Sequence, residues 1–210
     1  MSEPIPDTGR QRHWQAVYSS KRENEVSWFE ETPALSVQLI EATGATKASA
    51  IIDVGGGASR LVDTLLAAGY ADVIVLDIAD SALDAARARL GDLASRAHWI
   101  AADITRWKNE RRYDVWHDRA VFHFLTEPAD RAAYFERLAA SLAPGGHAII
   151  GTFAPDGPER CSGLPVVRYD EASLARSMPA GFAPVGSQRF EHVTPWGAVQ
   201  SFQFTTFRKE

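Results

Sequence analysis

The stretch Ile51-Ile52-Asp53-Val54-Gly55-Gly56-Gly57-Ala58-Ser59 decides the fold. Its short apolar run is typical of a strand buried in a parallel sheet, and its three glycines allow a sharp turn and a close approach to a ligand. An apolar stripe over 61–69 predicts a helix ended by Gly69, and residues 73–77 predict a second strand. The stretch therefore opens a strand–helix–strand unit with a glycine turn after its first strand.

An acidic residue ends the second predicted strand. Asp77 lies twenty residues after Gly57, where nucleotide-binding units of this kind use a carboxylate to accept hydrogen bonds from ribose hydroxyls. A dinucleotide fingerprint that begins at Gly55 needs glycine at position 60, but the chain has Arg60. The spacing thus favours a nucleoside without a pyrophosphate. The alternative is an α/β protein with a tight turn and no cofactor.

The pattern Asp53-x-Gly55-x-Gly57, followed by Asp77, resembles motifs I and II of the class I S-adenosylmethionine-dependent methyltransferases. Ser59 stands where that family often carries a third glycine. The resemblance implies that the chain binds S-adenosyl-L-methionine and its product S-adenosyl-L-homocysteine. The implied contacts from this region are Asp53, Gly55, Gly57, Ser59, Asp77 and Ile78.

The rest of the chain predicts the remaining elements of such a fold. Strands are expected at 97–102, 113–118 and 147–153, with residues 119–125 continuing the strand at 113–118 toward the site. Two runs, 182–193 and 198–207, are expected to close the chain as an antiparallel pair, which fits the resembled fold. The sequence therefore predicts a Rossmann-like, doubly wound α/β fold. Its seven-stranded sheet is mostly parallel, with an antiparallel last strand and helices on both faces.

Composition limits the classes of protein that fit. The 210 residues, 45% of them hydrophobic, fit one domain with a sizeable core. A net charge of -5 argues against a nucleic-acid partner, and no apolar run approaches the roughly 18 to 20 residues that span a membrane. The single Cys161 favours a reducing, cytoplasmic compartment, and the six histidines lack the spacing of a zinc site.

Aromatic residues precede the predicted sheet. Trp14, Tyr18 and Trp28 lie at helical spacing and either pack against the core or form a lid. Their arrangement resembles the amino-terminal segment of a bacterial methyltransferase subgroup that is also related to some lysine methyltransferases, in which a cap covers the cofactor. We therefore expect residues 1–45 to form a cap and residues 46–210 to form the methyltransferase domain.

Further candidates follow the third and fourth predicted strands. In the resembled family an acidic residue at the position of Asp103 commonly contacts the adenine amino group, so we expect Asp103 and the adjacent Ile104 to contact the cofactor. The alternative is that Asp103 is an acidic loop residue that is only solvated. Asp118 and Arg119 end the next strand, where the cofactor tail and the acceptor meet in such sheets. His123 is the histidine of suitable pKa in this segment, so it is either a catalytic base or a packed structural side chain.

The acceptor is the part of the function that the sequence specifies least. Arg168 and Tyr169, in the loop 154–170, are candidates for binding an acidic group on the acceptor. A thiol is already partly ionised at neutral pH, so it demands less of an enzyme than an amine does. We therefore expect transfer of a methyl group to a small thiol-type or anionic acceptor. A protein-lysine N-methyltransferase and a non-catalytic cofactor-binding or scaffolding module are the alternatives.

Overall fold

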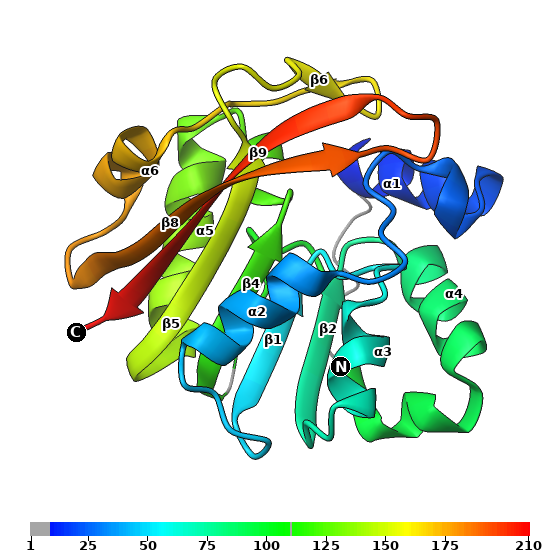
Figure 1. The fold of residues 1–210 in the computed structure, drawn as a ribbon, viewed down its shortest axis with the longest axis horizontal. Helices are drawn as coiled ribbons and strands as arrows, with labels where there is room; N and C mark the ends of the chain where they lie inside the picture. Colours follow the sequence, from blue (N-terminus) through cyan, green and yellow to red (C-terminus); the bar gives the residue numbers. More distant parts are fainter. Residues whose placement is uncertain (1–8, 110) are drawn as a thin grey trace.

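A single seven-stranded sheet organises the computed structural model, which describes residues 9–109 and 111–210 (Figure 1). Residues 1–8 of the predicted cap lie outside the described part. The strand order is β3-β2-β1-β4-β5-β9-β8, and a separate two-stranded sheet pairs β6 with β7. The strands are β1 (Ala50–Val54), β2 (Asp72–Asp77), β3 (Ala97–Ala101), β4 (Tyr113–Arg119), β5 (Leu142–Phe153), β6 (Arg160–Cys161), β7 (Leu164–Pro165), β8 (Phe182–Val193) and β9 (Val199–Lys209).

The direction of the strands confirms the predicted fold class. β1 to β5 pair in parallel, and β9 runs antiparallel to both β5 and β8. The chain therefore inserts its last strand between the fifth strand and β8. Since the order runs 3-2-1 and then 4-5, the topological switch point lies between β1 and β4, where open α/β sheets bind their ligands.

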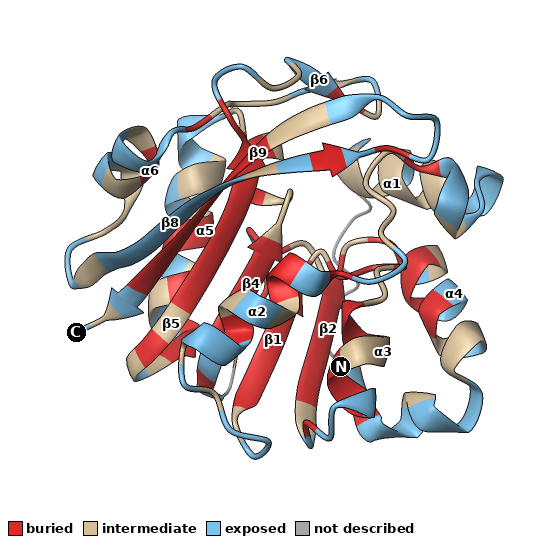
Figure 2. Cartoon of the chain, in the orientation of Figure 1, coloured by how far each residue is buried: buried red, intermediate tan, exposed pale blue. Residues whose placement is uncertain are grey.

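Helices cover both faces of the sheet. They are α1 (Gly9–Ser20), α2 (Ala34–Ala42), α3 (Leu61–Ala67), α4 (Asp80–Leu90), α5 (Pro128–Ser141) and α6 (Glu171–Ser177), with short 3-10 turns η1 (Glu23–Glu25), η2 (Gly91–Arg96) and η3 (Phe122–Phe124). Adjacent Ile51 and Ile52 belong to two different hydrophobic clusters because successive side chains of a strand point to opposite faces. The central strands are consequently buried on both sides (Figure 2).

The chain turns sharply after β4. The expected continuation of this strand over 119–125 is wrong, because β4 ends at Arg119 and η3 follows. Asp118 accepts hydrogen bonds from the backbone N–H groups of Val121 and Phe122, at 2.8 and 3.1 Å, and these bonds fold the backbone back. Ala120, which lies between Asp118 and Val121, has a φ of 73°, a left-handed conformation that is uncommon for a residue with a side chain. Such local strain is often found at functional sites.

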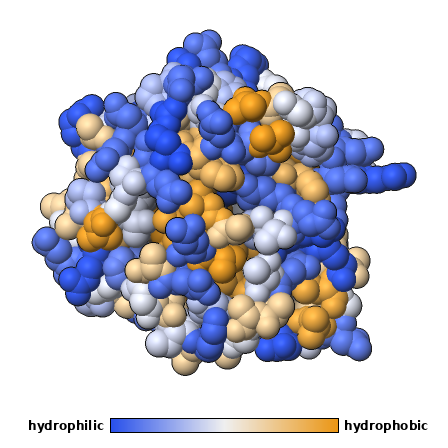
Figure 3. Space-filling view, viewed as in Figure 1, coloured by the Kyte–Doolittle hydropathy of each residue, from blue (hydrophilic) through white to orange (hydrophobic). Residues whose placement is uncertain are grey.

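The surface on the side shown in Figure 3 is mostly hydrophilic, with apolar residues gathered near its centre. Among the helices of the described ranges, none is long and apolar enough to cross a membrane.

The contact between β5 and β9 allows a first test of the sheet. Gly151 pairs with Phe204, and a Cβ added to Gly151 would lie 2.5 Å from the Phe204 ring. We expect Gly151→Ala to lower the free energy of unfolding by about 1–3 kcal/mol, because the packed ring would have to move. Gly186→Ala on β8 is the matched control, since nothing lies within 4 Å of the added atom. Urea denaturation measures both, and equal midpoints would contradict the described packing.

Candidate functional site

A pocket lies at the carboxyl ends of the parallel strands, at the switch point between β1 and β4. It contains about 830 Å³ of empty space, part of it open to solvent. Its walls come from β1, β2, β4, β5, β6 and β9, from the segment after β3, and from α1 above them. The walls include nine of the predicted cofactor residues: Trp14, Tyr18, Trp28, Gly55, Asp77, Ile78, Asp103, Ile104 and Arg119.

The glycine turn is shaped for close approach. Gly55 and Gly57 have φ values of 71° and 40°, in the left-handed region that glycine adopts without strain. A Cβ on Gly57 would lie 2.6 Å from Asp77 Oδ2 and 3.3 Å from the Tyr18 hydroxyl. Any side chain here would therefore push into the space between the turn, the acid and the aromatic residue from α1.

Asp77 presents one carboxylate oxygen to this space. Its Oδ1 accepts a hydrogen bond of 2.8 Å from the backbone N–H of Ala79, and the residue is buried. Burial raises the pKa of Asp77 to about 7, against the opposing effect of the hydrogen bond from Ala79. A ligand whose hydroxyl groups donate hydrogen bonds to Asp77 would favour the ionised form.

Asp103 also has an oxygen without a hydrogen bond. Its Oδ1 accepts from the backbone N–H and hydroxyl of Thr105, at 2.9 and 2.7 Å. Its Oδ2 is buried and has no hydrogen-bond partner within 9–109 and 111–210, although Arg10 Nη2 lies 3.6 Å away. A ligand N–H group could satisfy this oxygen.

Arg119 offers the complementary groups. Its Nη1 lies 2.9 Å from Glu30 Oε2 and 3.2 Å from the carbonyl oxygen of Trp28, and its guanidinium lies over the Phe202 ring. Its Nε and Nη2 are buried and lack a hydrogen-bond partner in the described part of the chain. Burial lowers the pKa of Arg119 from its ordinary high value, against the opposing effect of Glu30. Two donors of a cation are thus available to an anionic group of a ligand.

A second pocket adjoins the first and shares Tyr18, Trp28, Gly55 and Arg119 with it. The predicted residues Asp53 and Ser59 line this pocket. Asp53 Oδ1 lies 2.7 Å from His117 Nδ1, and His117 Nε2 lies 2.9 Å from the Ser36 hydroxyl. All three side chains are buried, so this chain of hydrogen bonds fixes the orientation of the Asp53 carboxylate.

The aromatic residues of the predicted cap meet above the pocket. The ring of Trp14 lies 5.7 Å from Trp28 and 5.0 Å from Phe124, in edge-to-face geometry. The side chain of Gln15 accepts hydrogen bonds from the backbone N–H and hydroxyl of Ser81 at the start of α4. Side-chain contacts therefore hold α1 both to η3 and to α4, and Figure 1 shows α1 next to α4.

Asp118 in β4 and His123 in η3 are not among the residues that line either pocket. Asp118 is fully buried and also accepts a hydrogen bond of 2.6 Å from the Tyr134 hydroxyl, so it orders the turn after β4. Burial raises the pKa of Asp118 to about 6, against the opposing hydrogen bond from Tyr134. The geometry supports a structural role in place of the predicted cofactor contact.

His123 is also fully buried, packed against the rings of Phe124 and Phe153. Its Nδ1 lies 3.3 Å from the backbone nitrogen of Phe153, which donates the hydrogen bond. Burial lowers the pKa of His123 to about 3, so the ring stays neutral at physiological pH. The geometry gives no support to His123 as a base that reaches an acceptor, because Phe124 and Phe153 line the pocket in front of it.

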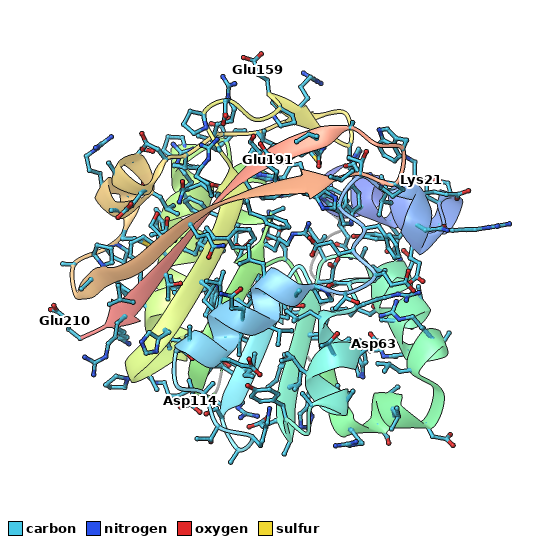
Figure 4. All side chains as sticks on the ribbon, viewed as in Figure 1. Lys21, Asp63, Asp114, Glu159, Glu191 and Glu210 are labelled. Carbon is cyan, nitrogen blue, oxygen red and sulfur yellow. The ribbon has the colours of Figure 1, made fainter. Side chains whose placement is uncertain are left out.

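The predicted acceptor residues lie elsewhere as well. Arg168 donates hydrogen bonds to the Gly157 carbonyl and to Glu159, which Figure 4 places at the outer edge of the molecule near β6. Tyr169 is buried, with its ring 5.3 Å from that of Phe122. Neither residue is among those that line the two pockets described above, and both belong to the packing of the loop after β5.

The sequence analysis missed several lining residues. Phe153 ends β5, and Phe202, near the start of β9, is its register partner. Phe124, Gln200 and Arg10 also line the pocket. The start of an antiparallel strand beside β5 must lie at the edge where the parallel strands end. The sequence analysis predicted an antiparallel closing pair, and pairing its second strand with β5 is what brings Gln200 and Phe202 to this edge.

Comparisons with known proteins agree with this geometry. Residues 51–146 match the sequence model of a family described as "Methyltransferase domain". A trans-aconitate 2-methyltransferase from Methylobacterium radiotolerans is 37% identical over 107 residues, which cover 50% of this chain and 37% of that protein. The chain spans 37% to 54% of the length of the curated relatives it matches.

Two solved structures show the same fold over nearly the whole chain. One is a 1,6-didemethyltoxoflavin-N1-methyltransferase from Burkholderia thailandensis with bound 1,6-didemethyltoxoflavin and S-adenosylhomocysteine. It has a TM-score of 0.74 and 24% identity, and the alignment covers 100% of this chain and 93% of that one. The other comes from work on the conversion of a disulfide bond into a thioacetal group during echinomycin biosynthesis, with a TM-score of 0.76, 21% identity and coverage of 96% and 93%.

The family prediction drawn from the glycine turn and Asp77 is confirmed by the match over residues 51–146 and by the shared fold. Residues 51–146 match a methyltransferase domain, and the chain has the fold of solved methyltransferases over nearly its whole length.

Proposed function

We propose that the chain is an enzyme that transfers a methyl group from S-adenosyl-L-methionine to a small nucleophilic molecule. One observation carries the proposal: the pocket walls hold unsatisfied polar groups that complement the parts of this cofactor. They are Asp103 Oδ2 and the Nε and Nη2 of Arg119, and the buried carboxylate of Asp77 lies beside them in the pocket wall.

Each group has a counterpart on the cofactor. Asp103 Oδ2 needs a hydrogen-bond donor, and the adenine amino group can supply one. The carboxylate of Asp77 can accept hydrogen bonds from the two ribose hydroxyls. Arg119 Nε and Nη2 suit the carboxylate of the methionine part, because guanidinium groups match carboxylates. Asp53, held by His117 in the adjoining pocket, supplies a negative charge for the ammonium group. The residues therefore fit the cofactor.

When bound, the cofactor supplies a sulfonium methyl group, which the acceptor's lone pair takes as the carbon–sulfur electron pair passes to sulfur. The residues of this chain bind, orient and exclude water. Such positioning can supply on the order of 7 to 11 kcal/mol of the barrier. Trp14, Tyr18 and Trp28 cover the pocket, so they would limit access of water to the reacting atoms.

No side chain of the chain is proposed as a base that takes a proton from the acceptor. Burial lowers the pKa of His123 to about 3, so its ring is a weak base, and it lies behind the pocket wall. Burial raises the pKa of Cys161 to about 11, so Cys161 remains a thiol. The acceptor must therefore bring its own lone pair and release its proton to water. A thiol-type acceptor meets this requirement. An anionic acceptor has less support because Arg168 pairs with Glu159 outside the pocket. The same composition arguments favour a cytoplasmic enzyme without nucleic-acid or membrane partners.

The direct test is binding of S-adenosylhomocysteine. Ligand at about 100 times its dissociation constant should add roughly 2.7 kcal/mol to the free energy of unfolding. For a domain of this size that corresponds to a rise in melting temperature of about 5 to 10 °C. NAD serves as the control ligand and should give no rise. A rise with NAD, or none with S-adenosylhomocysteine, would contradict the proposal.

A second experiment distinguishes the proposed enzyme from its two alternatives. The protein is incubated with methyl-labelled cofactor and a cell extract, and small molecules are then separated from macromolecules. Label in small molecules supports the proposal, whereas label in protein alone indicates a lysine methyltransferase. Binding of the cofactor without any transfer indicates a non-catalytic module.

A further inference from the structure

The pocket has two ends of different chemistry, as the strand order requires. Asp77 and Asp103 follow β2 and β3, on one side of the switch point. On the other side lies an acceptor chamber, defined here by Phe124, Phe153, Cys161, Gln200 and Phe202, with Trp14 above it. The proposed cofactor contacts of Asp77 and Asp103 place the nucleoside at the first end. The second end is then left to the acceptor.

Aromatic rings form most of the chamber. The rings of Phe153 and Phe202 lie 4.8 Å apart, and the ring of Trp14 lies 5.0 Å from that of Phe124. Phe153 and Phe202 are buried, and Phe124 is partly buried. These rings come from α1, η3, β5 and β9, so the chamber exists only where these elements meet. Flat apolar walls of this kind favour a flat apolar ligand, because stacked and edge-to-face rings attract each other beyond the area they bury.

The chamber offers little to a charged ligand. Arg119 is the cation nearest the chamber, because its guanidinium lies over the Phe202 ring, and Glu30 Oε2 lies 2.9 Å from its Nη1. Its free Nε and Nη2 are already assigned to the cofactor's carboxylate in the proposed function. Cys161 is an uncharged thiol, and neutral His123 lies behind Phe153 and Phe124. Once Arg119 is paired with Glu30 and with the cofactor's carboxylate, an anion placed here would lose its hydration without gaining a cation of its own.

Gln200 provides a polar group to the chamber. It lies on β9 two residues before Phe202, so both side chains point to the same face of the strand. Its Oε1 is buried and has no hydrogen-bond partner in the described ranges. Leaving a buried acceptor unpaired costs about 1–3 kcal/mol, so a ligand that donates an N–H or O–H bond to it would recover this energy.

We propose that the acceptor is an uncharged, flat aromatic ring compound with an N–H or O–H group that hydrogen bonds to Gln200 Oε1. The proposal rests on the proposed function and names the substrate class of the same site. It narrows the small acceptor of the proposed function to a neutral, flat ring compound, and it makes Gln200 a residue that determines specificity.

The test measures binding to protein saturated with S-adenosylhomocysteine, using calorimetry and three probes. Benzimidazole is flat, uncharged at pH 8 and carries an N–H group; benzothiazole keeps the shape without the N–H; benzimidazole-5-carboxylate adds a charge. Benzimidazole should bind about fivefold more tightly than benzothiazole, which is the value of about one hydrogen bond. The carboxylate should bind at least tenfold more weakly than benzimidazole.

A variant connects the preference to Gln200. Gln200→Leu should lower the affinity for benzimidazole to that for benzothiazole, with binding of benzothiazole and S-adenosylhomocysteine unchanged. Gln200→Ala repeats the measurement with a smaller side chain. Gln188→Leu is the matched control, since Gln188 is exposed on β8 and is absent from this pocket's walls.

Several results would overturn the proposal: tighter binding of the carboxylate, no binding of any probe, or an unchanged preference in both Gln200 variants. These results differ from a failure of the proposed function, in which S-adenosylhomocysteine itself does not bind to the unaltered protein.

Discussion

Asp77→Asn is expected to weaken binding of S-adenosylhomocysteine about 100-fold or more. The variant replaces the carboxylate that the ribose hydroxyls would meet, and hydrogen bonds to charged groups contribute about 1.5–3 kcal/mol each. Asparagine keeps a carbonyl oxygen that can accept the bond from Ala79, so the turn after β2 should persist. Calorimetry measures the affinity. Unchanged affinity would show that Asp77 does not contact the ligand, which would contradict the role that its position in motif II implies.

The same substitution should make the ligand-free protein more stable at pH 8. Burial raises the pKa of Asp77 to about 7, above its ordinary value of 3.8, so the folded state holds a proton more tightly than the unfolded state does. The contribution of Asp77 to stability therefore falls as the pH rises from about 4 to about 7, and stays low above that. Asparagine has no such charge. We expect a gain of up to about 4 kcal/mol at pH 8 and little gain at pH 4, since the pKa rises from 3.8 to about 7 and one pKa unit corresponds to about 1.4 kcal/mol.

Urea denaturation of both proteins at the two pH values measures this difference. Asp92→Asn, at an exposed position in η2, is the control for the loss of one negative charge. A variant less stable than the unaltered protein at pH 8 would show that the buried charge is compensated within the folded state. We therefore expect one substitution to raise the stability of the ligand-free protein and to weaken ligand binding. Such a trade-off is common at functional sites.

The sequence predicted the parts of the site that depend on local order along the chain. Gly55 and Asp77 were predictable because a glycine turn and an acid at fixed spacing follow two buried strands. Parallel strands then bring Asp103 to the same edge without further information. In these cases the direction of the strand alone determines where the residue lies.

The acceptor side required information that adjacent residues do not carry. His123 follows Arg119 by only four residues, yet Arg119 lines the pocket and His123 is packed in the core, because the chain turns at Ala120 in a left-handed conformation. Gln200 reaches the chamber only because β9 pairs with β5, about fifty residues earlier in the chain. Side-chain direction after a sharp turn, and contacts between distant strands, are tertiary properties that a motif does not encode.

Deleting residues 1–20 should weaken binding of S-adenosylhomocysteine about 100-fold and leave the sheet folded. The deletion removes Arg10, Trp14 and Tyr18 from the pocket walls, but no residue of α1 is fully buried. The loss should therefore fall on the ligand more than on the core, which is the property that distinguishes a cap from structural packing. Calorimetry measures the affinity, and far-ultraviolet circular dichroism checks that the strands and helices persist.

The double variant Trp14→Ala/Tyr18→Ala tests the same idea in the full-length chain. It should reproduce most of the loss in affinity, because these two aromatic side chains make the contacts above the glycine turn and Phe124. Hydrogen exchange adds a measurement without any substitution: amides in residues 13–30 should become protected when S-adenosylhomocysteine binds. Unfolding of the truncated chain, together with unchanged exchange in this segment, would show that the aromatic residues only pack against the core. Protection of 13–30 with a folded truncated chain would establish that α1 closes over the ligand.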